Sequence, residues 1–354
     1  MQDQIQYLPF SKINVNDIFF DSLRADYSDF NSWFAKKSAG IEKAYVQTIG
    51  DRVTGFLYLK DEECPVTDVF PIIEGNRALK MGTLKIDSHG TRLGERFIKK
   101  SVDTALHSEC DKIYVTIFKK HIKLINMFKK YGFYLHGEKI KGEDIEQVYV
   151  KDILIDNSDI FKNYPKITTK GNSKFLLSVY PQFHTKLFPD SKLKNEKIDI
   201  LKDVSHTNSI EKIYICKMKQ VQNVHKGDLI YIYRTKEKGS KIPAKYASVL
   251  TSICTVEDVV NMDRFKTFEE LKSYCKNYSV FDNDTLKSMF KYKQEYFLIR
   301  MLYNIALPKR ITRGELIEKT DLTEHVYWGF TELDDTMIEE IGKLGEINEC
   351  YIIN

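Results

Sequence analysis

The segment that starts at Leu84 has the residue types that bind anions. A run rich in apolar residues ends at Ile86, and a polar stretch with Gly90 and Gly94 leads directly into a predicted helix. The first backbone N–H groups of a helix have no partner within it and carry the positive end of the helix dipole. This order therefore predicts a phosphate-binding loop that ends near Glu95.

A mixed α/β sheet is predicted to hold this loop. Two strands around Gly50-Asp51-Arg52 form a predicted hairpin, and two strand–helix units follow it. The parallel strands of these units are expected at the centre of the sheet. The predicted strands are Ala44–Ile49, Thr54–Lys60, Ala78–Ile86 and Lys112–Phe118, with others near Phe133 and Gln147, and the predicted helices are Asp26–Ala39, Leu93–Leu106 and His121–Tyr131.

Over roughly Ile41 to Val150 the sequence resembles the GNAT superfamily of acyl-CoA-dependent N-acetyltransferases. The family's loop usually reads R/Q-x-x-G-x-G/A; here His89 stands in the first position, Arg92 replaces the usual Gly, and Gly94 is kept. The guanidinium of Arg92 is expected to contact a phosphate directly. The resemblance implies that acetyl-CoA is the cofactor and that it is contacted by Leu84, Ile86, His89, Gly90, Thr91, Arg92, Leu93, Gly94 and Glu95.

The same resemblance places Phe128 where the family commonly has the tyrosine that protonates the departing CoA thiolate. Phenylalanine has no proton to donate, and general acid help is typically worth ~10²- to 10⁴-fold in rate. Transfer is therefore expected to be slowed rather than abolished, or to use another group. The residues assigned to proton transfer are Tyr131, Tyr114 and Asp87, with Tyr134, His89 and Glu95 as further nearby groups.

The second half of the sequence predicts an α+β unit with a barrel-like sheet. It resembles the ASCH and EVE branch of the PUA-like fold, small β-barrels associated with RNA or modified nucleic acid, over roughly Phe175 to Leu302. The G-x-K-x-x-E signature of ASCH proteins is not recovered, because Asp190 and Asn195 stand in place of its Gly and Glu. The predicted strands are Phe175–Tyr180, Lys212–Cys216, Asp228–Tyr233, Tyr246–Val256 and Glu295–Leu302, with helices near Phe265–Tyr274 and Asp284–Phe290 and a tail of short pieces over Arg313–Ile353.

A basic loop with neighbouring tyrosines in this half indicates nucleic-acid binding. Lysine and arginine neutralise phosphates, and tyrosine rings stack on the bases of single-stranded RNA. The alternative is that the lysines are merely solvated and the tyrosines fill the core of the barrel. The residues predicted to bind nucleic acid are Arg234, Lys236, Lys238, Lys241, Lys245, Tyr233 and Tyr246.

Composition sets limits on the class of protein. The chain has 354 residues, of which 42% are hydrophobic and 29% charged, which is typical of globular domains and excludes collagen or a disordered chain. Six scattered cysteines with no C-x-x-C pair predict reduced thiols and no metal site. No apolar run approaches the ~20 residues of a membrane span, and the first ten residues lack a signal-peptide pattern, so a cytoplasmic protein without a membrane partner is expected.

The predicted fold class is an α/β domain with a GNAT-like mixed sheet and flanking helices, followed by an α+β domain with a PUA-like β-barrel. The predicted boundaries are 1–152 for the first domain, 153–172 for a linker and 173–354 for the second with a helical extension. The leading hypothesis is an acetyl-CoA-dependent N-acetyltransferase whose second domain recruits an RNA-linked acceptor such as tRNA or aminoacyl-tRNA. The alternatives are a degenerate acyl-CoA or nucleic-acid binding protein, and an acetyltransferase that acts on a protein or small amine.

Overall fold

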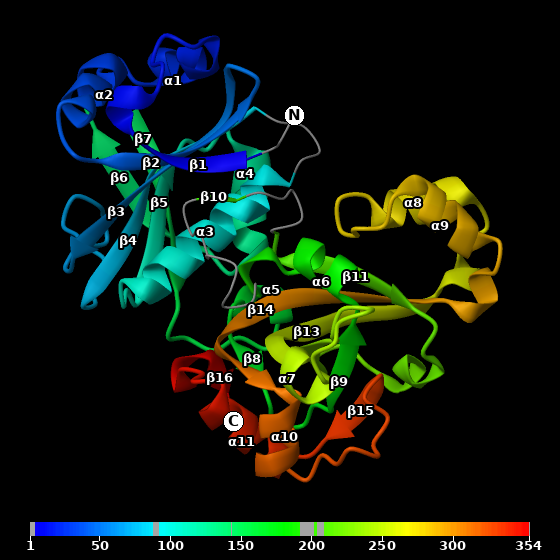
Figure 1. Cartoon of the computed structure of the whole chain (residues 1–354). Helices are drawn as coiled ribbons and strands as arrows, with labels where there is room; N and C mark the ends of the chain where they lie inside the picture. Colours follow the sequence, from blue (N-terminus) through cyan, green and yellow to red (C-terminus); the bar gives the residue numbers. More distant parts are fainter. Residues whose placement is uncertain (1–3, 88–91, 143, 192–201, 204–208, 354) are drawn as a thin grey trace. The chain divides into compact units, whose positions relative to one another are not determined.

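The computed structural model describes residues 4–87, 92–142, 144–191, 202–203 and 209–353. Within these ranges the chain divides into two compact units. The first contains the described residues up to Ile155 together with strand β10 (Lys202–Asp203), and the second contains the described residues from Asp156 onward apart from β10. Figure 1 shows the elements of both units along the chain.

The first unit is built on an eight-stranded mixed sheet with the strand order β10-β1-β2-β3-β4-β5-β7-β6. Strands β4 and β5 pair in parallel, and the other neighbouring strands pair antiparallel. The predicted mixed sheet with an internal parallel pair is therefore confirmed. The strands are β1 (Gln4–Pro9), β2 (Lys43–Ile49), β3 (Arg52–Glu63), β4 (Arg77–Ile86), β5 (Lys112–Ile117), β6 (Tyr134–Lys141) and β7 (Asp144–Asp152).

Helix α3 (Leu93–His107) packs on β3, β4 and β5 and also contacts α4 (Ile122–Lys130). The apolar residues of α3 recur at helical spacing and are buried, as the sequence predicts: Leu93, Phe97, Ile98, Val102 and Ala105. Gly132 follows α4 with φ of 86°, which is the left-handed conformation expected after a helix.

One helix was predicted over Asp26–Ala39, and the structure instead has two, α1 (Asp21–Asp26) and α2 (Phe30–Ser38). The break occurs because Tyr27 is extended, with φ of −132° and ψ of 104°. Helix α1 buries Leu23 and α2 buries Phe30 and Phe34 in one cluster with β2 and β3, which also includes Phe10, Phe20 and Phe56.

The second unit contains a six-stranded sheet with the order β11-β14-β13-β12-β9-β15 and a small β16–β8 sheet. The predicted barrel is not shown, because β11 and β15 lie at opposite ends of the order and form no pair within the described residues. Both faces of this sheet are apolar: Ile230 and Ile232 of β12 belong to one core cluster, and Tyr231 and Tyr233 belong to the other. The strands are β8 (Ile167–Thr168), β9 (Lys174–Val179), β11 (Glu211–Cys216), β12 (Leu229–Arg234), β13 (Val249–Asn261), β14 (Phe297–Thr312), β15 (Phe330–Leu333) and β16 (Ile352–Ile353).

Two strand boundaries in this unit differ from the sequence prediction. The strand expected from Tyr246 begins at Val249, because a short helix occupies the preceding residues. The strand expected to end at Leu302 continues to Thr312 as β14. The helices are α5 (Ile160–Asn163), α6 (Pro181–Leu187), α7 (Ala244–Ala247), α8 (Phe268–Cys275), α9 (Asn283–Phe290), α10 (Arg313–Lys319) and α11 (Asp335–Leu344).

All six cysteines are free, and four of them are buried. Among the described residues, no helix has both the length and the apolar character needed to cross a membrane.

Candidate functional site

The parallel strands β4 and β5 pair over only part of their length. Their pairing runs from Ala78 opposite Lys112 to Met81 opposite Val115, whereas β4 continues to Ile86. Beyond Met81 no further pair between these strands is found in the described residues. The edge of β4 that would face β5 is thus open over its last five residues.

A β-bulge in β4 lies at the point where the two strands separate. On the β3 side, Tyr58 is opposite Thr83 and Leu59 is opposite Met81, so the residue between them, Gly82, has no partner position. The Thr83 hydroxyl donates a hydrogen bond to the Gly82 carbonyl oxygen at 2.8 Å. A side chain at position 82 would also contact the Tyr58 ring, since its Cβ atom would lie 3.0 Å from Tyr58 Cδ1.

The first unit has a cavity of about 1180 Å³ around this separation. It extends from the start of α3 to the region of α1, α2 and the β6–β7 hairpin, and both apolar and charged side chains line it. The described lining residues are Ser22, Leu23, Asp26, Tyr27, Asp29, Phe30, Trp33, Lys36, Lys37, Tyr58, Lys60, Glu62, Lys80–Ile86, Arg92–Gly94, Val115–Ile117, Lys120–Leu124, Met127, Lys139, Lys141 and Glu146.

Several residues predicted to bind the cofactor lie together at one end of this cavity. Leu84 and Ile86 of β4 line it, and so do Arg92, Leu93 and Gly94 at the start of α3. The predicted residues His89, Gly90 and Thr91 lie outside the described residues. Glu95 is buried, forms an ion pair with Arg92 and does not line the cavity.

The start of α3 packs closely against α4 at Gly94. A Cβ atom at this position would lie 2.5 Å from the sulfur of Met127 and 3.3 Å from Cδ1 of Ile86. Met127 and Ile86 also line the cavity, so a large side chain at position 94 would displace its walls.

The three residues assigned to proton transfer, Tyr131, Tyr114 and Asp87, are described, and none of them lines the cavity. The Tyr114 hydroxyl donates a hydrogen bond to Glu62, and burial raises the pKa of Tyr114 above its ordinary value, as does this hydrogen bond. Tyr131 is buried, and its carbonyl oxygen accepts a hydrogen bond from Lys151 at 2.9 Å. Asp87 is exposed and forms an ion pair with Arg52 at 3.2 Å.

Phe128 is fully buried, with its ring centroid 5.0 Å from that of Phe133, and it does not line the cavity. Two tyrosines, Tyr27 and Tyr58, do line the cavity, and the hydroxyl of each is hydrogen-bonded. Tyr27 donates a hydrogen bond to Glu146 at 2.6 Å, and Tyr58 accepts one from Lys37 at 2.9 Å. Burial raises the pKa of Tyr27, and the contact with Glu146 raises it further.

Sequence reasoning missed the part of the cavity that faces away from α3. Tyr27 lines it from the turn between α1 and α2, and Phe30 and Trp33 line it from α2. Lys80 and Lys139 line it from β4 and β6. The available signal was the i, i+3 spacing of Phe30 and Trp33 on a predicted helix, but the pairing of strands was needed to place the lysines.

The residues predicted to bind nucleic acid fall into two groups in the second unit. Tyr233 is buried with its ring centroid 5.2 Å from that of Trp328, and Arg234 is buried and paired with Glu237 at 3.1 Å. The remaining five are exposed around α7, and Tyr246 keeps 65% of its surface accessible. These five, Lys236, Lys238, Lys241, Lys245 and Tyr246, are called the α7 basic surface below.

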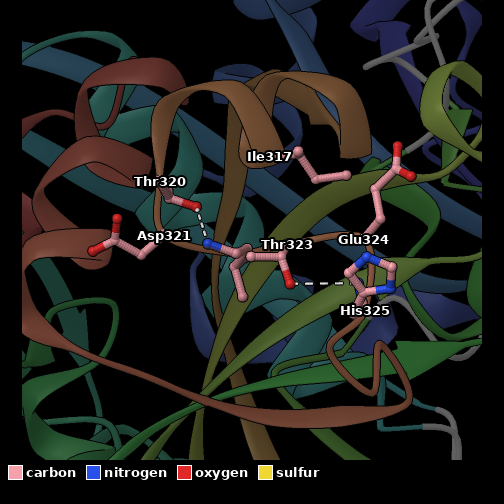
Figure 2. Close-up of a pocket in the computed structure, with 7 residues that line it drawn as sticks. Ile317, Thr320, Asp321, Thr323, Glu324 and His325 are labelled. Atoms are coloured by element: carbon pink, nitrogen blue, oxygen red, sulfur yellow. Dashed lines mark hydrogen bonds between the residues drawn. The ribbon is translucent and has the colours of Figure 1, made fainter.

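A smaller hollow of about 400 Å³ lies in the second unit, between Ile317 and His325 (Figure 2). The Leu322 N–H donates to the Thr320 hydroxyl at 3.2 Å, and the His325 N–H donates to the Thr323 hydroxyl at 3.3 Å. These two hydroxyls stabilise local turns, so their role in this hollow is to hold the conformation of the loop.

No protein-family model matches the sequence, and no curated protein matches it. Some solved structures resemble parts of the chain. An ASCH protein from Zymomonas mobilis is 14% identical, with 48% of this chain and 94% of that chain covered and a TM-score of 0.32. An IAA acetyltransferase from Bacillus cereus ATCC 14579 is 15% identical, with 42% of this chain and 97% of that chain covered and a TM-score of 0.30.

Naa50 from Arabidopsis thaliana, solved in complex with the bisubstrate analogue CoA-Ac-MVNAL, is 18% identical over 34% of this chain and 80% of that chain, with a TM-score of 0.27. The chain is thus similar at low identity to ASCH domains and to acetyltransferases.

Proposed function

We propose that the first unit is an acyltransferase that moves an acetyl group from acetyl-CoA to an amine. The observation that carries this proposal is the separation of β4 from β5 at Gly82, because it opens a cavity that ends at the start of α3. The thioester supplies an activated acyl group, so that the amine nitrogen forms a bond to the carbonyl carbon while the carbon–sulfur bond breaks.

The residues present fit such a ligand at both ends. Arg92, Leu93 and Gly94 bring a guanidinium and the positive end of a fifteen-residue helix to one end of the cavity, which suits a pyrophosphate. The open edge of β4 after Met81 offers backbone groups to the amides of a pantetheine arm. We propose that the Gly82 N–H donates a hydrogen bond to the thioester carbonyl oxygen, because the bulge removes this residue from pairing with β3.

Proton transfer is assigned to groups other than Phe128. That ring is buried in the core and has no acidic proton, whereas the Tyr27–Glu146 pair lies in the cavity wall. We propose that Glu146 accepts the proton of the acceptor amine, directly or through water. Tyr131, Tyr114 and Asp87 then have structural roles, since none of them lines the cavity.

Calorimetric titration of the full chain with acetyl-CoA tests this function. We expect saturable binding, and Gly94→Trp should lower the affinity at least tenfold, because the indole would occupy space between α3 and α4. Gly342→Trp is the matched control, since a Cβ at position 342 in α11 meets no atom within 4 Å. Absence of binding to the folded wild type at millimolar acetyl-CoA would refute the proposal.

For the second unit we propose RNA binding through the α7 basic surface. The supporting observation is that four lysines and one tyrosine around a single short helix are all exposed. Lysine ammonium groups there can neutralise phosphates, and the exposed Tyr246 ring can stack on a base. On this proposal the second unit brings an RNA-linked acceptor to the chain.

A further inference from the structure

Three lysines lie close together in the wall of the cavity that faces away from α3. Lys60 of β3 is directly opposite Lys80 of β4 in the antiparallel pairing, and Lys139 of β6 lies beside Lys80. All three line the cavity. Like charges in directly opposite positions destabilise a sheet, so this arrangement needs a compensating negative charge.

The acids around these lysines do not balance them. Glu62 accepts hydrogen bonds from Lys60 at 2.7 Å and from the Tyr114 hydroxyl, and its single negative charge is matched by the Lys60 ammonium. Among the described acids beside these lysines, Asp68 is then the carboxylate left for two ammonium groups. It forms ion pairs with both, closely with Lys139 and at 3.6 Å with the Lys80 nitrogen, so one negative charge is shared by two ammonium groups.

The shared carboxylate also lies outside the cavity. Asp68 does not line it, and 52% of the Asp68 side chain is exposed, whereas the side chains of Lys80 and Lys139 are 16% and 19% exposed. Burial lowers the pKa of Lys80; the negative charge of Glu62 opposes this shift, and the neighbouring Lys139 ammonium adds to it. Within this cluster the cavity wall has three lysines and one acid, Glu62, and therefore an excess of positive charge in a partly desolvated place.

This cluster lies far from the end of the cavity assigned to the pyrophosphate. Six residues of strand separate Lys80 from Ile86, which corresponds to roughly 20 Å at the usual rise of a β-strand. Lys80 is only two residues, or roughly 7 Å, from Gly82. An anion at the lysines would therefore belong to the acceptor rather than to CoA.

We propose that Lys80 and Lys139, with Lys60, form a subsite for a negatively charged group of the acceptor, a phosphate or a carboxylate that lies close to the reacting amine. This inference rests on the proposed acyltransferase function and adds the chemical class of its acceptor. It does not depend on RNA binding by the second unit.

Calorimetric titration with inorganic phosphate and with acetate tests the subsite, using the full chain saturated with CoA so that the cofactor's own anion site is filled. At least one of the two anions should bind the wild type, and the stronger one identifies phosphate or carboxylate as the preferred group. The double variant Lys80→Gln/Lys139→Gln should weaken that binding by about tenfold or more, because two charge-assisted hydrogen bonds are lost.

The matched control is Lys43→Gln, an exposed lysine on β2 that does not line the cavity, and it should bind the anion as the wild type does. Failure of both anions to bind, or unchanged binding by the double variant, would overturn the subsite. CoA binding is measured separately in the same samples. If the wild type binds CoA but neither anion, only the subsite is refuted, whereas failure of the wild type to bind CoA refutes the acyltransferase.

Discussion

Phe128 shows at the level of one residue how this site departs from the family that its sequence resembles. A tyrosine at that position would be the expected general acid, yet here the ring packs on Phe133 in the core. On the proposed acyltransferase function, we expect acid catalysis to come from another group or from water. Tyr27 and Glu146 are the pair that the cavity offers.

Phe128→Tyr should therefore change the rate of acetyl transfer less than about twofold, far below the ~10²- to 10⁴-fold typical of an added general acid. The variant should also lose roughly 1–3 kcal/mol of unfolding free energy, because a hydroxyl is buried without a designed partner. The measurements are CoA thiol release with hydroxylamine as a surrogate acceptor and unfolding in urea.

Phe133→Tyr is the control, since it adds the same hydroxyl to the other ring of the pair. It should lower stability similarly and leave the rate unchanged. A rate gain of tenfold or more in Phe128→Tyr alone would show that the new hydroxyl reaches the thiolate and that position 128 belongs to the site.

Individual site residues could be predicted only where a local motif marks them. Leu84, Ile86, Arg92, Leu93 and Gly94 follow from one strand–loop–helix segment, and all five line the cavity. The lysine cluster could not be predicted, because its members come from three strands and become neighbours only through the pairing register. The sequence left open whether Tyr233 is exposed or fills the core, because both faces of β12 are apolar and alternation gives no outward side.

At the level of elements, much of the first sheet follows from the sequence. Only Gly50 and Asp51 lie between β2 and β3. This tight turn is possible because Gly50 adopts a φ of 63°, as the predicted hairpin requires. Strand β1 and its pairing with β2 were not predicted. The decisive bulge at Gly82 was not predictable either, since β4 reads as one continuous strand and the bulge depends on its pairing with β3.

At the level of the whole molecule, the functions proposed for the two units are independent of each other. The acyltransferase function proposed for the first unit depends on one cavity formed by that unit's own residues. The RNA-binding proposal for the second unit depends on exposed charge around α7, and the barrel that would have supported it is not shown among the described residues. Either function can fail without the other.

RNA binding by the full chain should be weak and steeply salt-dependent. Each lysine–phosphate contact with a single strand adds ~0.7 to the slope of log K against log salt. Lys236→Glu/Lys238→Glu should weaken binding and flatten that slope, whereas Tyr246→Ala should weaken binding at an unchanged slope. The measurement is fluorescence anisotropy of a labelled single-stranded oligoribonucleotide across a salt series.

Lys219→Glu/Lys226→Glu is the matched control, because both lysines are exposed in the same unit but lie away from α7. It should leave affinity and slope as in the wild type. An equal loss in the control would show that only net charge matters, and no binding at low salt would remove the RNA proposal.

The structure of the full chain in complex with CoA is the most direct test of the central claim. We expect the pantetheine arm along the open edge of β4 after Met81, the thiol near Gly82 and the pyrophosphate at the start of α3, beside Arg92 and Gly94. A complex in which CoA binds outside this cavity, or in which its pantetheine makes no contact with β4 between Gly82 and Ile86, would contradict the account.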